Sequence, residues 1–144
     1  MVERQPRFPE ESRDAAMKDA THILLTHGHG DHTGDALALS RETGAPLVGI
    51  YDLMGHWEVT EGVATVGFNK GGTVHLGRVA VSMVAATHSS SLGSDAGPVY
   101  AGAGAGYIIR GEGHCIWLRT QSLETSRAFQ ASVPIFLRLH PCPS

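Results

Sequence analysis

A dense group of metal-type ligands lies between Thr26 and Asp35, where the chain reads Thr-His-Gly-His-Gly-Asp-His-Thr-Gly-Asp. The pattern is H-x-H-x-D-H, and its ligand residues are His27, His29, Asp31 and His32. Neutral imidazole nitrogen and carboxylate oxygen are the usual ligands of zinc, and the same set accepts manganese. Glycines between the ligands let the backbone bend tightly, so that alternate side chains reach the same side. The pattern predicts a divalent-metal site, with zinc favoured and manganese as the alternative.

Two other interpretations compete for this segment. A histidine in a solvated loop is the ordinary explanation for any one of these residues alone, but the full pattern is much more specific. A glycine-rich phosphate loop also follows a strand and precedes a helix. Its G-x-G-x-x-G spacing requires glycine where Thr33 stands, so the phosphate loop is the weaker hypothesis.

Bulk composition narrows the class of protein. With 144 residues we expect one domain, and a net charge of −3 without a basic stripe predicts neither nucleic acid nor an anionic membrane as partner. A small-molecule substrate is the expected partner, and the oligomeric state is not predicted. The two cysteines form no C-x-x-C pair, and no segment has 18 consecutive apolar residues. These features predict a cytoplasmic protein.

The elements that must position the motif alternate in the first half of the chain. We expect a helix over 9–20, a buried strand over 22–26 that delivers the motif, a helix over 35–43 ending at Gly44, a strand over 46–50, and a helix over 52–62 with Asp52 as N-cap. Alternation of strand and helix predicts parallel strands covered by helices on one face, and hence an α/β fold.

The second half is predicted to be dominated by antiparallel sheet. Glycine turns at Gly77 and around residue 112 predict hairpins of strands 73–76 with 79–85 and 107–110 with 114–118. His88 directly follows the strand 79–85, so it is the best candidate for a further nitrogen ligand. The Ala-Gly run 101–106 is predicted to be a flexible loop, and a role in cradling a cofactor is the weaker alternative.

The motif resembles the defining loop of the metallo-β-lactamase superfamily. Phe8-Pro9, the segment 22–32, Gly71-Gly72-Thr73-Val74 and His88-Ser89-Ser90-Ser91 resemble the small UPF-type metal-dependent hydrolases related to ascorbate-phosphate lactonases, over roughly 5–117. The resemblance implies an αββα sandwich with the metals at one edge. It also implies a hydrolase in which metal-activated hydroxide attacks an ester, lactone or phosphoester-type bond.

The resemblance assigns roles to individual residues. It implies that His27, His29 and His88 hold a first metal, and that Asp31 and His32 hold a second. Asp31 is also the candidate catalytic base, and Thr26 and Asp35 are candidates to orient ligand imidazoles. Ser89 to Ser91 are expected to shape their loop rather than attack substrate.

The chain departs from the family pattern at both ends. The family places an N-terminal hairpin before the segment that here begins at residue 5, and after Ile116 it continues into a turn whose aspartate bridges the metals, followed much later by a last histidine. We therefore expect a partial sandwich over 1–117 and a divergent tail over 118–144, disordered or out of frame, with a family-specific extension as the alternative. His114 and His140 are weak candidates to replace missing ligands. The rival function is an inactive or truncated fragment that binds one metal without catalysis.

Overall fold

The computed structural model describes residues 17–111, 114–118 and 135–137. Within them the chain order is β1 (His22–Leu24), α2 (Gly30–Thr33), α3 (Ala36–Thr43), β2 (Leu47–Ile50), α4 (Tyr51–Glu61), β3 (Thr65–Phe68), β4 (Thr73–Leu76), β5 (Val79–Ala85), β6 (Ser91–Leu92), β7 (Val99–Tyr100), β8 (Ala105–Gly111), β9 (His114–Leu118) and β10 (Ile135–Leu137). The predicted α/β class is confirmed.

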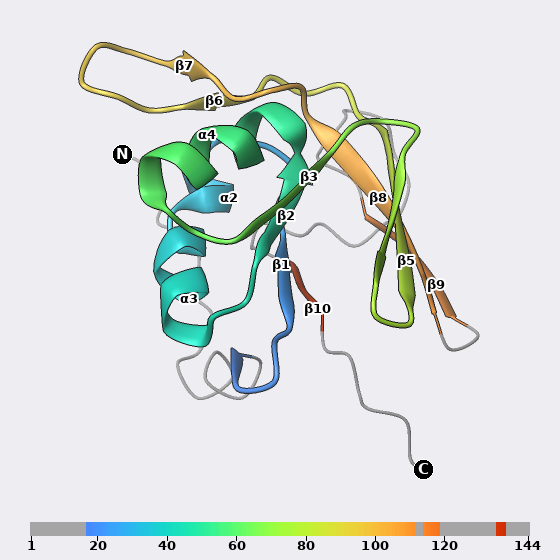
Figure 1. Cartoon of the computed structure of the whole chain (residues 1–144). Helices are drawn as coiled ribbons and strands as arrows, with labels where there is room; N and C mark the ends of the chain where they lie inside the picture. The colour runs from blue at the N-terminus through green and yellow to red at the C-terminus, as the bar shows by residue number, and fades with distance from the viewer. Residues whose placement is uncertain (1–16, 112–113, 119–134, 138–144) are drawn as a thin grey trace, which may run out of the picture.

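The first sheet has the strand order β10-β1-β2-β3. β1, β2 and β3 are parallel, as the alternation of strand and helix predicts, and β10 pairs antiparallel with β1. The four residues of β2 are all buried, because this strand lies between helices and a second sheet. Figure 1 shows α2, α3 and α4 on one side of the sheet and the second sheet on the other.

The second sheet is antiparallel, with the order β4-β5-β8-β9, and both predicted hairpins are present in it. β5 alternates, and its buried residues Val81 and Met83 face the core beside Tyr107 and Ile109 of β8. These side chains join Ile23 of β1 in one hydrophobic cluster. The described part of the chain therefore contains a helix layer and two packed sheets, the partial form of the expected sandwich, together with a two-stranded antiparallel sheet of β6 and β7.

Helices α3 and α4 end as their sequences predict, at glycines that adopt left-handed conformations, with φ of 74° at Gly44 and 65° at Gly62. The predicted N-cap of α4 is wrong. β2 passes into α4 without a connecting residue, so Ile50 holds the N-cap position and Asp52 lies in the first turn. A carboxylate there is still favourable, because it lies near the positive end of the helix dipole.

The Ala-Gly run differs most from its prediction as a flexible loop. Five of its six residues, Ala101, Gly102, Gly104, Ala105 and Gly106, are buried, and the run continues into β8. A Cβ on Gly102 would lie 2.6 Å from Ile50 Cγ2, so small side chains are needed for close packing. The run is therefore a packed segment rather than a free loop, and we call residues 101–106 the Ala-Gly strap.

Several predictions concern residues outside the described ranges. The expected helix over 9–20 lies almost entirely there, as does His140. Of the expected tail 118–144, Leu118 pairs with Tyr107 at the end of β9, and Ile135–Leu137 pairs with β1 as β10, the edge strand of the first sheet. The division at residue 117 otherwise stays a prediction. Among the described helices, none is long and apolar enough to cross a membrane.

Candidate metal centre

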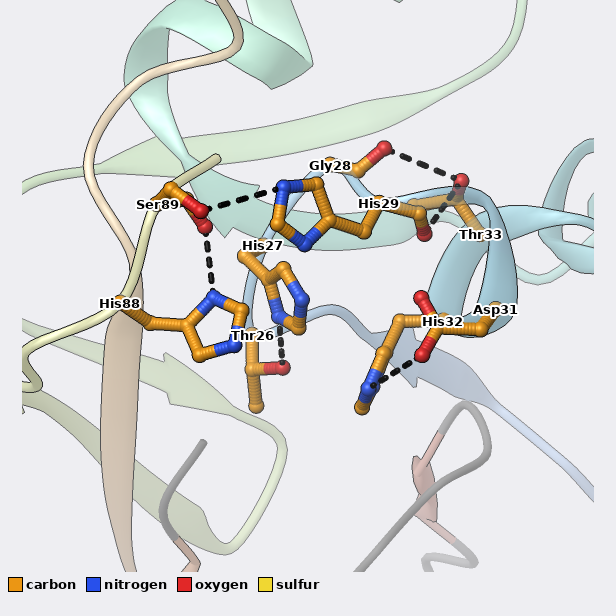
Figure 2. Close-up of polar contacts among 9 residues, drawn as sticks. All are labelled: Thr26, His27, Gly28, His29, Asp31, His32, Thr33, His88 and Ser89. Carbon is orange, nitrogen blue, oxygen red and sulfur yellow. Dashed lines mark hydrogen bonds and ion pairs between the residues drawn. The ribbon is translucent and has the colours of Figure 1, made fainter. Parts of the chain in front are cut away.

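Two loops bring the predicted ligands to one place. The first follows β1 and leads through His27 and His29 into the short helix α2, which carries Asp31 and His32. The second follows β5 and carries His88. In Figure 2, His27 lies between His88 on one side and the Asp31–His32 pair on the other. The structure thus brings together all five residues that the sequence predicts as ligands.

His27 is the centre of this group. Its ring centroid lies 4.7 Å from that of His29, 4.2 Å from that of His32 and 4.3 Å from that of His88. The side chain is buried, with 1% of its surface exposed. Nδ1 is hydrogen-bonded to Thr26 Oγ1 at 3.0 Å, which confirms Thr26 as an orienting residue, whereas Nε2 has no hydrogen-bond partner among the described residues.

The first set of ligand atoms comes from His27, His29 and His88. These atoms lie within 4.8 Å of one another. His88 Nδ1 is 2.7 Å from the Ser89 carbonyl oxygen, which can only accept, so Nδ1 carries the proton and Nε2 has a free lone pair. His29 Nε2 lies 3.4 Å from Ser89 Oγ, in a contact exposed to solvent. Three protein ligands of this type, with water in the fourth position, are typical of a catalytic zinc site.

The second set comprises His27, Asp31 and His32, and it shares His27 with the first. Only Asp31 and His32 therefore belong to this set alone. The Asp31 side chain is 63% exposed and that of His32 is 16% exposed, with Asp31 Oδ2 3.5 Å from His32 Nε2. This set is more open to water and has fewer independent ligands than the first.

Electrostatics keep the central imidazoles neutral. Burial, and to a lesser extent the neighbouring rings of His32, His88 and His29, lower the pKa of His27 to about 4, against the opposing effect of Asp31. Burial also lowers the pKa of His32, and the adjacent Asp31 carboxylate partly opposes this. A neutral imidazole keeps the lone pair that a metal ion needs, so no proton must be displaced near neutral pH.

The residues present fit a divalent metal ion. A buried ring nitrogen without a hydrogen-bond partner is costly in a folded protein, typically about 1–3 kcal/mol. Coordination would satisfy His27 Nε2, and the imidazole and carboxylate donors are those preferred by zinc and manganese. The arrangement offers one ion three nitrogen ligands, from His27, His29 and His88.

Other sequence-predicted candidates lie elsewhere. Asp35 is exposed before α3, and its side chain has no hydrogen bond to an imidazole among the described residues, so its predicted orienting role is wrong. His114 begins β9 opposite Gly111, in the hairpin with β8. Ser90, one of the serines expected to shape its loop, has a buried hydroxyl that accepts a hydrogen bond from the Gly28 amide. The buried Tyr107 hydroxyl, which donates to the Leu25 carbonyl oxygen, has no signal in the sequence.

Comparison with known proteins agrees with this geometry. Residues 1–132 match the family model described as the beta-lactamase superfamily domain. A protein of Dinoroseobacter shibae named "UPF0173 metal-dependent hydrolase" is 69% identical over 113 residues, which cover 78% of this chain and 49% of the relative. A protein of Paracoccus denitrificans with the same name is 59% identical over the same shares.

Among solved structures, the chain is similar to Igni18, described as a novel metallo hydrolase from the hyperthermophilic archaeon Ignicoccus hospitalis. The TM-score is 0.55 at 31% sequence identity, covering 67% of this chain and 40% of that one. The chain spans about half the length of the curated relatives it matches. Because the family model covers most of its residues, the chain belongs to the beta-lactamase superfamily domain family.

Proposed function

We propose that this chain supplies the metal-binding half of a metal-dependent hydrolase, and that His27, His29 and His88 hold the principal ion. The observation that carries the proposal is the buried, unpartnered His27 Nε2 between two further imidazoles. The names of the relatives, which are metal-dependent hydrolases, support the same activity. Zinc is the proposed metal and manganese the alternative, because both accept this donor set.

The residues around the ion have separate roles in the proposed hydrolysis. When bound, a divalent metal supplies Lewis acidity, which polarises a carbonyl or phosphoryl oxygen and makes water a nucleophile near neutral pH. The exposed Asp31 carboxylate can accept a proton from the attacking water and return it to the leaving group. The Thr26 hydroxyl orients the His27 ring, and the Ser89 carbonyl fixes the tautomer and orientation of His88.

The proposed substrate is a small molecule with an ester, lactone or phosphoester-type bond. The fold family hosts several such chemistries, so the bond type does not follow from the fold. We also propose a cytoplasmic location, since Cys115 is an exposed free thiol, which is typical of a reducing compartment.

One observation favours a second function, metal binding without catalysis. The second ligand set shares His27 with the first, so a second ion would have only Asp31 and His32 as its own ligands. If hydrolysis requires two ions, this chain alone would bind one and leave substrate intact.

Metal analysis and an activity screen together test these proposals. The full chain is dialysed against zinc or manganese, its metal content is measured, and lactone, thioester and phosphodiester substrates are then supplied. We expect about one tightly held ion per chain, following the ligand count, and turnover that His29→Ala abolishes. His75→Ala is the matched control, because His75 is an exposed histidine on β4. One bound ion without turnover would favour the binding function, and no bound ion would contradict both.

A further inference from the structure

Ser90 is a buried residue that touches both ligand loops and belongs to neither ligand set. Its side chain lies two residues after His88, and its hydroxyl oxygen accepts a hydrogen bond from the Gly28 amide at 3.0 Å. The same hydroxyl donates to the Ala101 carbonyl oxygen at 3.1 Å. Only 7% of the residue is exposed. Gly28 separates His27 from His29, so this one hydroxyl joins the backbone of the first loop to the loop that carries His88.

The Ala-Gly strap completes the same connection. The Ala101 amide donates to the Ser90 carbonyl oxygen at 3.3 Å, and the Ala105 amide donates to the Thr26 carbonyl oxygen at 2.8 Å. A Cβ on Gly28 would lie 2.6 Å from Ala101 Cβ, and one on Gly104 would lie 3.0 Å from His88 Cβ. The strap therefore packs directly against both ligand loops.

We infer that Ser90 is a positioning residue for the metal centre, which sets the separation of His88 from His27 and His29 through its hydrogen bonds to Gly28 and Ala101. The inference rests on the proposed function, since it concerns the same ion. Ser90 touches no ligand nitrogen, and it acts only through the backbone of the two loops. Ligand-orienting groups of this kind typically change metal affinity by about 10- to 100-fold when they are removed.

The chain offers a matched control in Ser40. This serine is buried to a similar degree, with 5% exposed, and its hydroxyl donates to the Ala45 carbonyl oxygen at 2.8 Å at the end of α3. Ser40→Ala and Ser90→Ala each remove one buried hydroxyl, which makes one hydrogen bond at Ser40 and two at Ser90, so both lower stability through lost hydrogen bonds. Only Ser90→Ala breaks a contact between the ligand loops.

The experiment is a titration of the full-length wild-type chain, Ser90→Ala and Ser40→Ala with Co²⁺, followed by the visible absorption of the bound ion. We expect Ser90→Ala to weaken Co²⁺ binding by about 10- to 100-fold and to alter the absorption spectrum, and Ser40→Ala to match the wild type in both. Ser90→Cys, which keeps the volume and a weak donor, should bind with intermediate affinity, and it serves as the test if Ser90→Ala does not fold.

Each outcome bears on the inference. Equal affinity and identical spectra for the wild type and the Ser90 variants would overturn it and leave the proposed metal site intact. A wild-type chain that binds no Co²⁺ would overturn the proposed function and this inference together.

Discussion

The two ligand sets of this chain differ in how deeply their side chains are buried and in how many ligands belong to one set alone. The set of His27, His29 and His88 is built around a buried imidazole, and the strap residues hold its two loops together. Asp31 and His32 lie on a four-residue helix, and Asp31 is largely exposed. Ligands fixed by a rigid surrounding lose less conformational entropy when an ion binds. We therefore expect the first set to bind an ion strongly by itself, whereas the second depends on His27, which the first already uses.

The largest expected effect follows from the substitution His27→Ala. Because His27 belongs to both sets, its loss should remove strong binding at both, and we expect zinc affinity to fall by about 100- to 1,000-fold. Calorimetric titration of the wild type and the variant measures this fall. His75→Ala, on the exposed face of β4, should leave the affinity unchanged. Retention of wild-type affinity by His27→Ala would remove the basis for treating His27 as the central ligand.

Acidification of the metal-free chain is expected to have the next largest effect. The pKa of His27 is about 4 in the folded chain against an ordinary value of 6.5. Between these values the unfolded chain takes up a proton that the folded chain does not, so the His27 contribution to stability is full above pH 6.5 and decreases as the pH falls towards 4. A shift of this size corresponds to at most about 3 kcal/mol.

Urea denaturation at a series of pH values measures this dependence, and His27→Asn is the comparison. The metal-free wild type should lose more stability than His27→Asn between pH 6.5 and 4. Parallel curves for the two proteins would show that burial does not suppress protonation of His27, and the contrast between the buried and exposed sets would then lose its electrostatic part.

A smaller effect is expected from Tyr107→Phe. The Tyr107 hydroxyl lies within the core and donates to the Leu25 carbonyl oxygen at 2.5 Å, just before the ligand loop. Burial raises the pKa of this phenol, so it stays protonated and remains a donor. Loss of the hydroxyl should lower the free energy of unfolding by about 1–2 kcal/mol, measured by urea denaturation. An unchanged midpoint would mean that this bond does not anchor the first loop.

The smallest effect is expected from His32→Ala. His32 is outside the first set, so the affinity for the first zinc ion should stay within about threefold of the wild type. Titration calorimetry with one equivalent of zinc measures it. A loss as large as that of His27→Ala would show that the two sets act as one and that the comparison drawn between them is mistaken.

The sequence predicts the local parts of this structure well. The H-x-H-x-D-H spacing, the apolar run of β1 and the glycine turns are signals carried by residues close in the chain, and they correctly predict parallel strands, both hairpins and the grouping of His27 to His32. His88 is brought to the group because it directly follows a strand. That these residues bind a metal stays a prediction.

The sequence does not predict the long-range contacts of this structure. The Ser90 hydroxyl meets the Gly28 amide across 62 positions, and no local pattern signals such a pairing. The Ala-Gly run is compatible with either a flexible loop or close packing, and only its neighbours Gly28, Ile50 and His88 decide between them. The pairing of β10 with β1 is likewise set by tertiary structure, since three residues of strand carry little signal of their own.

The most direct test of the central claim is a crystal structure of the full chain with one equivalent of zinc, in which anomalous scattering locates the ion. We predict one principal site, in which His27 Nε2 is a ligand together with nitrogens of His29 and His88. An ion held instead by Asp31 and His32, with His27 Nε2 left uncoordinated, would contradict the account.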